Sequence, residues 1–172
     1  MSAFSNDDTY NVVAEHVIEA LQLDTKLGSG GALEIKLWEQ ELREDAASYN
    51  DNELPAIAVA VRIGGEDVIS IGDRLEDGFI ATIMTITGGG RLREIVQEAK
   101  RIAARVERVM RQQHLPDKQL NDLPADLDGG VTGSVEVSNP STEADGGEVD
   151  DSLRGVAVTT VSIAVEIDMP ED

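Results

Sequence analysis

The chain has no cysteine among its 172 residues. This absence excludes disulfide bonds, thiolate metal sites and a cysteine nucleophile. Histidine is almost absent as well, because only His16 and His114 occur, and two imidazoles are too few for a multi-histidine metal centre. Aromatic residues are scarce, with two Phe, two Tyr and one Trp. We therefore expect an aliphatic core built largely from Val, Ile and Ala.

Long apolar runs are also missing. None approaches the roughly 18 residues that a membrane-spanning helix requires. The polar, acidic first ten residues lack the basic and apolar regions of a secretory signal. These absences predict an intracellular, soluble product with no membrane contact. The length of 172 residues is that of one domain, so we expect a single domain over residues 1–172.

Basic residues are outnumbered, since 14 Lys and Arg face 34 Asp and Glu, which gives a net charge of -20. Such a surface repels itself and weakens the compact state. In molar salt the Debye length falls to roughly 3 Å, so the repulsion is largely screened. The composition therefore predicts a protein adapted to concentrated salt. Nucleic acid is not expected to bind most of this surface, because carboxylates repel phosphates.

Apolar periodicity predicts the secondary structure. Hairpin-length links join the early strands, so we expect a mainly antiparallel sheet with both helices on one face, an α+β two-layer sandwich. An irregular acidic loop region is expected at about 114–154, and its part from 141 to 152 is predicted to be mobile. The predicted helices span 7–23 and 91–113, and the predicted strands span 33–38, 55–63, 67–71, 79–87, 131–138 and 156–169.

Three glycines, Gly88, Gly89 and Gly90, separate a predicted strand from the long helix. Phosphate-binding loops occupy such positions, because helix N-termini attract anions. The GxxxxGK[ST] motif is absent, however, and the GxGxxG pattern fails at its last glycine. A hinge that reverses the chain into the helix is the favoured interpretation.

The long helix is basic although the protein is acidic. Seven basic and three acidic residues in 91–113 give +4, which leaves -24 for the rest of the chain. One interpretation is a solvated face with pairs such as Glu107–Arg111. The other is an electrostatic contact with an acidic neighbouring subunit. Nucleic-acid binding ranks third, because no aromatic platform accompanies the helix. The basic residues are Arg91, Arg93, Lys100, Arg101, Arg105, Arg108 and Arg111.

The remaining candidates favour structural roles. The acidic run with Gly129 fails the spacing of a calcium loop, and its members are Asp122, Asp126 and Asp128. His16 and His114 lack a paired nucleophile and are interpreted as structural or surface groups. Trp38 lies on the polar side of an alternating strand, where it is either an interface anchor or part of a second core layer. No residue is singled out as catalytic, cofactor-binding or metal-binding.

The element order resembles that of tail terminator proteins of long-tailed phages, also called tail completion or minor tail proteins. The resemblance extends from about residue 8 to 168. It covers the N-terminal helix, the alternating strand, the strand Leu54-Pro55-Ala56-Ile57-Ala58-Val59, a further strand, the long amphipathic helix and the late strand. The acidic stretch 139–152 has no counterpart in this pattern.

The resemblance implies a virion protein without catalytic residues or cofactors. It implies a homohexameric ring that caps the tail tube and joins it to the head connector, while DNA passes through without specific binding. With the salt-adapted composition, the implied source is a tailed virus assembled in a haloarchaeal cytoplasm. The alternatives are another connector or the tube protein, a halophilic host ligand-binding or regulatory domain with a ferredoxin-like sheet, and, third, an enzyme using a carboxylate pair.

Overall fold

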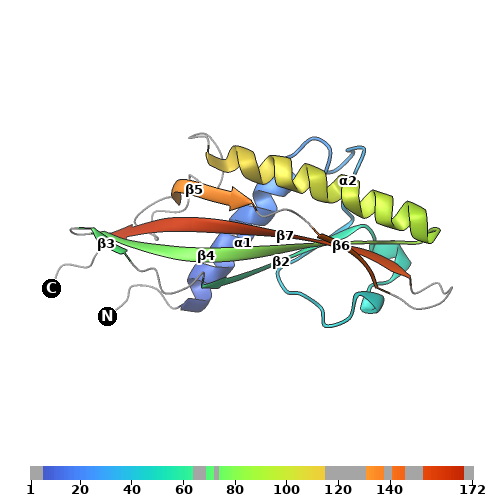
Figure 1. Cartoon of the computed structure of the whole chain (residues 1–172), viewed down its shortest axis with the longest axis horizontal. Helices are drawn as coiled ribbons and strands as arrows, with labels where there is room; N and C mark the ends of the chain where they lie inside the picture. Colours follow the sequence, from blue (N-terminus) through green and yellow to red (C-terminus); the bar gives the residue numbers. More distant parts are fainter. Residues whose placement is uncertain are drawn as a thin grey trace.

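A computed structural model describes residues 6–63, 69–71, 74–114, 131–137, 141–145 and 153–168. Two long helices and a sheet dominate this part of the chain (Figure 1). The elements in chain order are α1 (Asn6–Gln22), β1 (Leu37–Glu39), η1 (Ala46–Ser48), η2 (Asp51–Glu53), β2 (Ala56–Ile63), β3 (Ile69–Ile71), β4 (Arg74–Gly88), α2 (Leu92–Arg111), η3 (Gln112–His114), β5 (Val131–Val137), β6 (Ser141–Asp145) and β7 (Arg154–Asp168).

The sheet is built on two long antiparallel strands, β4 and β7, which run side by side along the long axis of the molecule (Figure 1). Their register joins Arg74 to Asp168 at one end and Gly88 to Arg154 at the other. The sheet order is β1-β2-β4-β7-β5, and β3 and β6 add to β4 and β7 respectively. Each of these pairings is antiparallel except that of β1 with β2, which is parallel.

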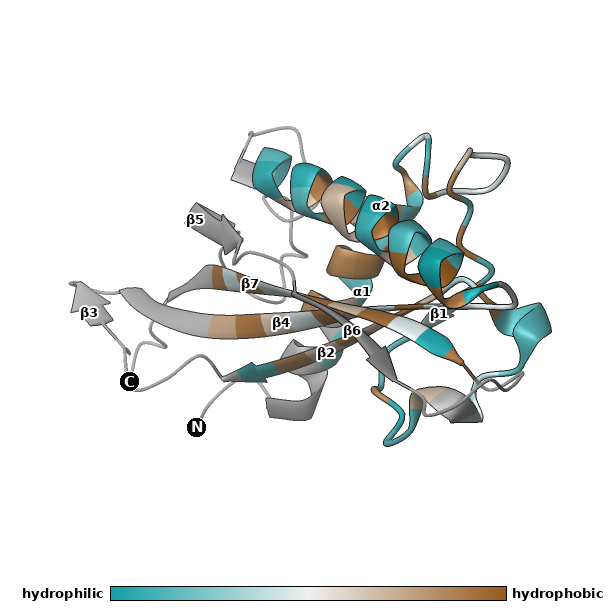
Figure 2. Cartoon of the chain, turned by 45° about the vertical axis from the view of Figure 1, so that its right-hand side comes forward, coloured by the Kyte–Doolittle hydropathy of each residue, from teal (hydrophilic) through white to brown (hydrophobic). Residues whose placement is uncertain are grey.

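Both helices pack on the same face of the sheet. The period of two places Ile57, Val59 and Ile83 on that face, where they are fully buried. Apolar side chains of α1 and α2 cover them and belong to the same core cluster, and Figure 2 shows by colour where the hydrophobic residues of the helices lie. Each such aliphatic side chain contributes roughly 1.5–3 kcal/mol through burial. The arrangement confirms the α+β two-layer fold with a mainly antiparallel sheet.

The opposite face of the sheet carries a second, smaller core. The segment between β1 and β2 folds under this face, and Tyr49 and Leu54 pack there against Ile86 and Val156. Half-buried Met84 and Val158 border this cluster. The loop and α2 therefore lie on opposite faces of the sheet (Figure 1).

The predicted strand 33–38 is wrong over most of its length, because β1 spans only Leu37–Glu39. The backbone before β1 forms hydrogen bonds outside the sheet, because the N–H groups of Leu33 and Ile35 donate to the carbonyls of Lys26 and Leu27 respectively. The faces also differ from the prediction. Trp38 is half-buried against the main core rather than in a second core layer, while Leu37 packs on the smaller core.

Two further predictions of irregular chain are wrong. The charged stretch 73–78 lies between the predicted strands 67–71 and 79–87, but Arg74–Gly78 belongs to β4 and pairs with β7. Likewise, Ser141–Asp145 forms β6 against the start of β7, although 141–152 was expected to be mobile. In both places pairing with β7, which is distant in the chain from Arg74–Gly78 but next along it from β6, supplies backbone hydrogen bonds that local polarity does not reveal. The strand expected at 131–138 is confirmed as β5.

Candidate interaction surfaces

Within the described ranges, no group of three or more His, Asp or Glu side chains is arranged to hold a metal ion. In the same ranges, no helix combines the length and apolarity needed to cross a membrane. Asp122, Asp126 and Asp128, which were considered as a calcium loop, lie outside the described residues. The side chain of His114 is outside them too. His16 lies half-buried on α1, and its Nδ1 atom is buried without a hydrogen-bond partner among the described groups.

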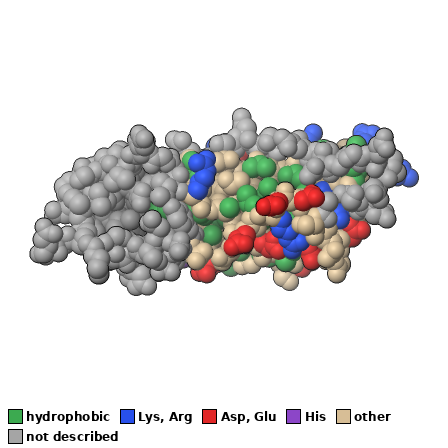
Figure 3. All heavy atoms as spheres, turned by 90° about the horizontal axis from the view of Figure 1, so that it is seen from below, with side chains coloured by type: hydrophobic (Ala, Val, Ile, Leu, Met, Phe, Trp, Pro, Cys, Tyr) green, Lys and Arg blue, Asp and Glu red, His purple; other side chains and the backbone are tan. Residues whose placement is uncertain are grey.

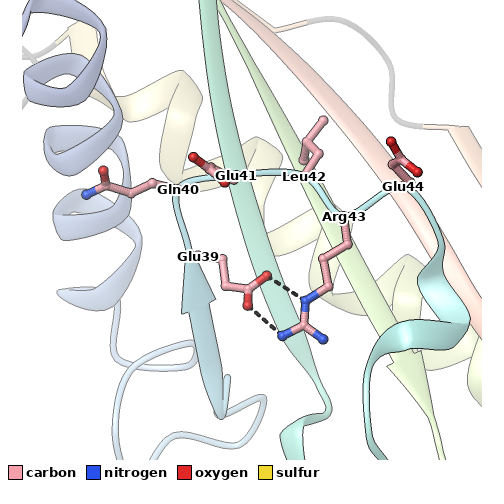
Figure 4. A pocket seen from close by; sticks show the side chains of 6 residues that line it. All are labelled: Glu39, Gln40, Glu41, Leu42, Arg43 and Glu44. Carbon is pink, nitrogen blue, oxygen red and sulfur yellow. Dashed lines mark hydrogen bonds and ion pairs between the residues drawn. The ribbon is translucent and has the colours of Figure 1, made fainter. Parts of the chain in front are cut away.

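A surface hollow is lined by six consecutive residues, from Glu39 at the end of β1 to Glu44. Figure 4 shows that Glu39 and Arg43 point toward one another, while the four other side chains point away from this pair. A hollow lined by one short stretch of chain does not bring together groups from several elements, as ligand sites do. We therefore interpret this region as an exposed loop surface.

The ion pair inside this loop is part of a network. Arg43 Nε donates to Glu39 Oε2 at 3.2 Å, Tyr49 OH donates to the same oxygen at 3.0 Å, and the Arg43 guanidinium lies 4.0 Å from the Tyr49 ring centre. Hydrogen bonds from Arg43 lower the pKa of Glu39 against the opposing effect of burial. Burial, and then the bond to Glu39, raises the pKa of Tyr49 to about 12. Near neutral pH the Glu39 carboxylate is therefore charged and the Tyr49 hydroxyl keeps its proton, so the hydrogen bonds of the network form and stabilise the loop.

A buried arginine fastens the same loop to the sheet. Arg154, at the start of β7, is only 4% exposed. Its Nη2 donates to the carbonyl of Tyr49 at 2.8 Å and lies 3.0 Å from Asp51 Oδ1. No sequence signal marked Arg154, because its partners lie about a hundred residues away in the chain. The loop is therefore held against the second face of the sheet at a defined position.

The glycines before α2 act as a chain reversal. Gly88 ends β4, Gly89 has φ +80, and α2 begins at Leu92. A positive φ suits glycine because it has no Cβ atom. Buried Thr87 then fixes the helix to the strand by donating its hydroxyl to the carbonyl of Ile95 at 2.7 Å. These contacts show that the chain reverses direction at the glycines and that α2 is fixed to β4.

The basic residues of α2 divide into two groups. Arg105 faces the core side, where its Nε lies 3.0 and 2.9 Å from the two carboxylate oxygens of Asp24. Burial opposes ionisation of Asp24, but Arg105 and the N–H groups of Leu27 and Lys26 outweigh it and lower the pKa of this carboxyl. The other group points outward. We call this exposed set the basic strip, and it comprises Arg93, Lys100, Arg101, Arg108 and Arg111.

Helical geometry places the basic strip opposite the buried side of α2. At 100° per residue, these five positions and the intervening Gln97 and Ala104 fall within about 100° of arc. The three acids of the helix lie at the sides of this arc, and one of them, Glu107, accepts from Arg111 at 3.1 Å. The predicted pair Glu107–Arg111 is thereby confirmed. The outward surface of α2 is thus positive along its whole length.

Seen from below the view of Figure 1, the molecule presents apolar side chains between acidic ones (Figure 3). The sheet face opposite the helices contributes half-buried Ala60, Met84 and Val158. Acidic side chains gather in the adjoining loop, where Glu41 and Glu44 are exposed. Two surfaces of opposite charge therefore lie on opposite sides of the sheet.

Comparisons with known proteins give a likeness of structure rather than of sequence family. No protein-family model matches the chain, and no curated protein matches it. Among solved structures, the fold resembles a chain in the virion of a native gene transfer agent particle, with a TM-score of 0.51 and 16% sequence identity. The likeness covers 88% of this chain and 93% of that chain. At this identity the likeness is one of fold.

Proposed function

We propose that this protein is a structural component of a virion and, more specifically, a tail terminator. The observation that carries the proposal is the likeness to the chain of the gene transfer agent virion, which spans nearly the full length of both chains. The order of elements in the sequence supports the same assignment independently. In this role the protein caps the finished tail tube and joins it to the head connector.

The proposed activity depends on shape and subunit contacts. Copies of the chain assemble into a homohexameric ring around a channel, and DNA passes through it without specific binding. An excess of carboxylates suits such a channel, because a wall that repels phosphates lets DNA slide. The net charge of -20 also supports assembly in concentrated salt, as in a tailed virus of haloarchaea. Location in the neck of the virion follows from this role.

The proposal is tested by measuring the mass of the purified chain in 3 M KCl, alone and after addition of its tail tube protein. The chain has a mass of 18.4 kDa. A closed ring of six copies therefore has a mass of about 110 kDa. We expect six-fold rings in negative stain, either free or at the tube ends. Tubes that grow to unlimited length in the presence of the protein would refute the proposal.

A second measurement separates the proposal from the host-domain alternative. Thermal unfolding in molar salt is recorded with and without a panel of nucleotides and small metabolites. A tail terminator shows no ligand-dependent rise in melting temperature, whereas a ligand-binding domain is stabilised by mass action. A stable monomer whose melting temperature rises with one metabolite would replace the virion assignment.

A further inference from the structure

The basic strip of α2 is a long, regular surface. Its first and last members, Arg93 and Arg111, are 18 residues apart, which corresponds to about 27 Å along a helix. All five of its cationic side chains are exposed. Four are arginines, whose planar guanidinium groups pair bidentately with carboxylates. The strip therefore has the dimensions and chemistry of a contact surface for an acidic partner.

The intramolecular contacts of the described residues leave most of this charge uncompensated. Arg105 is bound to Asp24 and Arg111 is bound to Glu107. In the described part of the chain, Lys100, Arg101 and Arg108 make no ion pair or side-chain hydrogen bond. Like charges crowded on one helical face destabilise it, so an opposing surface would relieve a repulsion that the isolated chain retains.

A counterpart exists on the same molecule. The segment 39–53, which we call the acidic loop, contains six acids and a single arginine, for a net charge of -5. Glu41 and Glu44 are exposed on it. Arg154 and the network around Tyr49 hold the loop against the sheet. The acidic loop is therefore a positioned surface on the face opposite α2.

We propose that the basic strip of one copy docks on the acidic loop of a second copy of this chain. Charge complementarity argues for this occupant, because the chain outside the long helix carries -24 and the acidic loop contributes -5 of this charge at a defined position. The two surfaces lie on opposite faces of the sheet, so one copy uses different surfaces toward its two neighbours. Such a heterologous contact generates a ring or a filament.

The inference rests on the proposed function, because it supplies the subunit contact of the proposed ring. The proposed contact is compatible with concentrated salt. In molar salt, where the Debye length is roughly 3 Å, distant charges are screened, and pairs in direct contact keep most of their interaction. Arginine–carboxylate pairs are of this kind. DNA is a poorer occupant, because the chain outside the long helix carries -24 and repels phosphates.

The test uses charge reversal of surface residues in the full-length chain. The strip variant carries Arg101→Glu and Arg108→Glu, and the loop variant carries Glu41→Arg and Glu44→Arg. Sedimentation velocity in 3 M KCl then measures assembly, in the presence of the tail tube if the ring forms only there. We expect each variant alone to associate roughly a hundredfold more weakly, because like charges then face each other across the contact.

Mixing the two variants gives the decisive readout. In a ring that alternates the two chains, every strip faces a loop of opposite charge, so the mixture is expected to regain wild-type assembly. A matched control reverses two exposed lysines away from the strip, Lys26→Glu and Lys36→Glu, with the same change in net charge. The control is expected to assemble normally, and circular dichroism checks that every variant is folded.

The outcomes distinguish this inference from the function on which it rests. Wild-type rings that persist unchanged in the strip variant would overturn the docking surface and leave the tail terminator intact. Loss of assembly without rescue in the mixture would also overturn it. A wild-type chain that neither forms rings nor caps tubes fails the proposed function itself. Binding of duplex DNA by wild type but not by the strip variant, with rings unchanged, would assign the strip to DNA instead.

Discussion

The contact between Asp24 and Arg105 offers a sharp test of how α1 and α2 are joined. Arg105 donates from both Nε and Nη2 to the Asp24 carboxylate. The Asp24 side chain is 7% exposed and the Arg105 side chain is 19% exposed, so water screens their pair only weakly. Replacing Arg105 with Met keeps most of the aliphatic stem of the side chain and removes the donors. The carboxylate is then left with the backbone N–H groups of Leu27 and Lys26.

The expected loss follows from the hydrogen bonds removed. A hydrogen bond to a charged group contributes about 1.5–3 kcal/mol to stability, and the bonds to Asp24 act as one unit. We therefore predict that Arg105→Met lowers the free energy of unfolding by about 2–3 kcal/mol. For a chain of this length, that corresponds to a fall in melting temperature of roughly 5–10 °C.

The assay is urea unfolding followed by circular dichroism in 3 M KCl, since urea leaves the ionic strength unchanged. Arg101→Met is the matched control, because Arg101 is exposed one turn away and its loss should change stability by less than about 0.5 kcal/mol. Adding Asp24→Asn to Arg105→Met should recover part of the loss by removing the unpaired charge. Equal effects of the Arg105 and Arg101 substitutions would refute the reasoning.

The pH dependence provides an independent check on the same pair. The pKa of Asp24 is lowered in the folded protein, so the folded state binds fewer protons there than the unfolded state. Its contribution is fully present above the unfolded pKa of about 3.9 and is lost as the pH falls through the lower, folded value. The stability difference between wild type and Arg105→Met should therefore narrow below about pH 4.

Three further predictions concern packing, titration and salt. Gly155→Ala would place a Cβ atom 2.5 Å from Thr87 Oγ1 and should cost about 1–3 kcal/mol, whereas Gly30→Ala, at φ +79 with no atom within 4 Å, should cost only about 1 kcal/mol; equal losses in urea unfolding would contradict this. Burial and Glu39 raise the pKa of Tyr49 to about 12. The contribution of Tyr49 to stability is therefore present below about pH 10 and is lost as the pH rises to 12. Absorbance titration, with Tyr49→Phe as the control, would check this. Desalting from 3 M to 0.1 M KCl should lower the melting temperature, and an unchanged value would remove the argument for salt adaptation.

Periodicity in the sequence was sufficient where an element buries one face. The strand predicted at 55–63 contains the alternating residues Ile57 and Val59, and both lie in the core beneath the helices. The long helix was predicted with ends within two residues of α2, because its apolar positions repeat over five turns. Burial of an apolar stripe requires an apolar residue at each position along it, so the spacing can be recognised in the local sequence.

Predictions failed where stability comes from backbone pairing with another strand rather than from burial of side chains. Arg74–Gly78 is charged and resembles a turn, yet β7 pairs with it along its whole length. β6 also depends on β7. A strand tolerates polar residues because the neighbouring strand forms hydrogen bonds with its backbone rather than with its side chains. The basic strip was also predicted only in part. The sequence showed the excess of basic residues in the long helix, but it did not show that Arg105 points inward while the basic strip points outward.

The sequence by itself determined the charge of the surface, the aliphatic core and the two-layer α+β class, because composition and short-range periodicity are local properties. Only the tertiary structure decided that the acidic loop lies across the sheet from α2 and that Arg154 holds it there. The physical reason is that a buried guanidinium requires partners to offset its desolvation. Those partners, Tyr49 and Asp51, are brought to it by the fold rather than by their position in the chain.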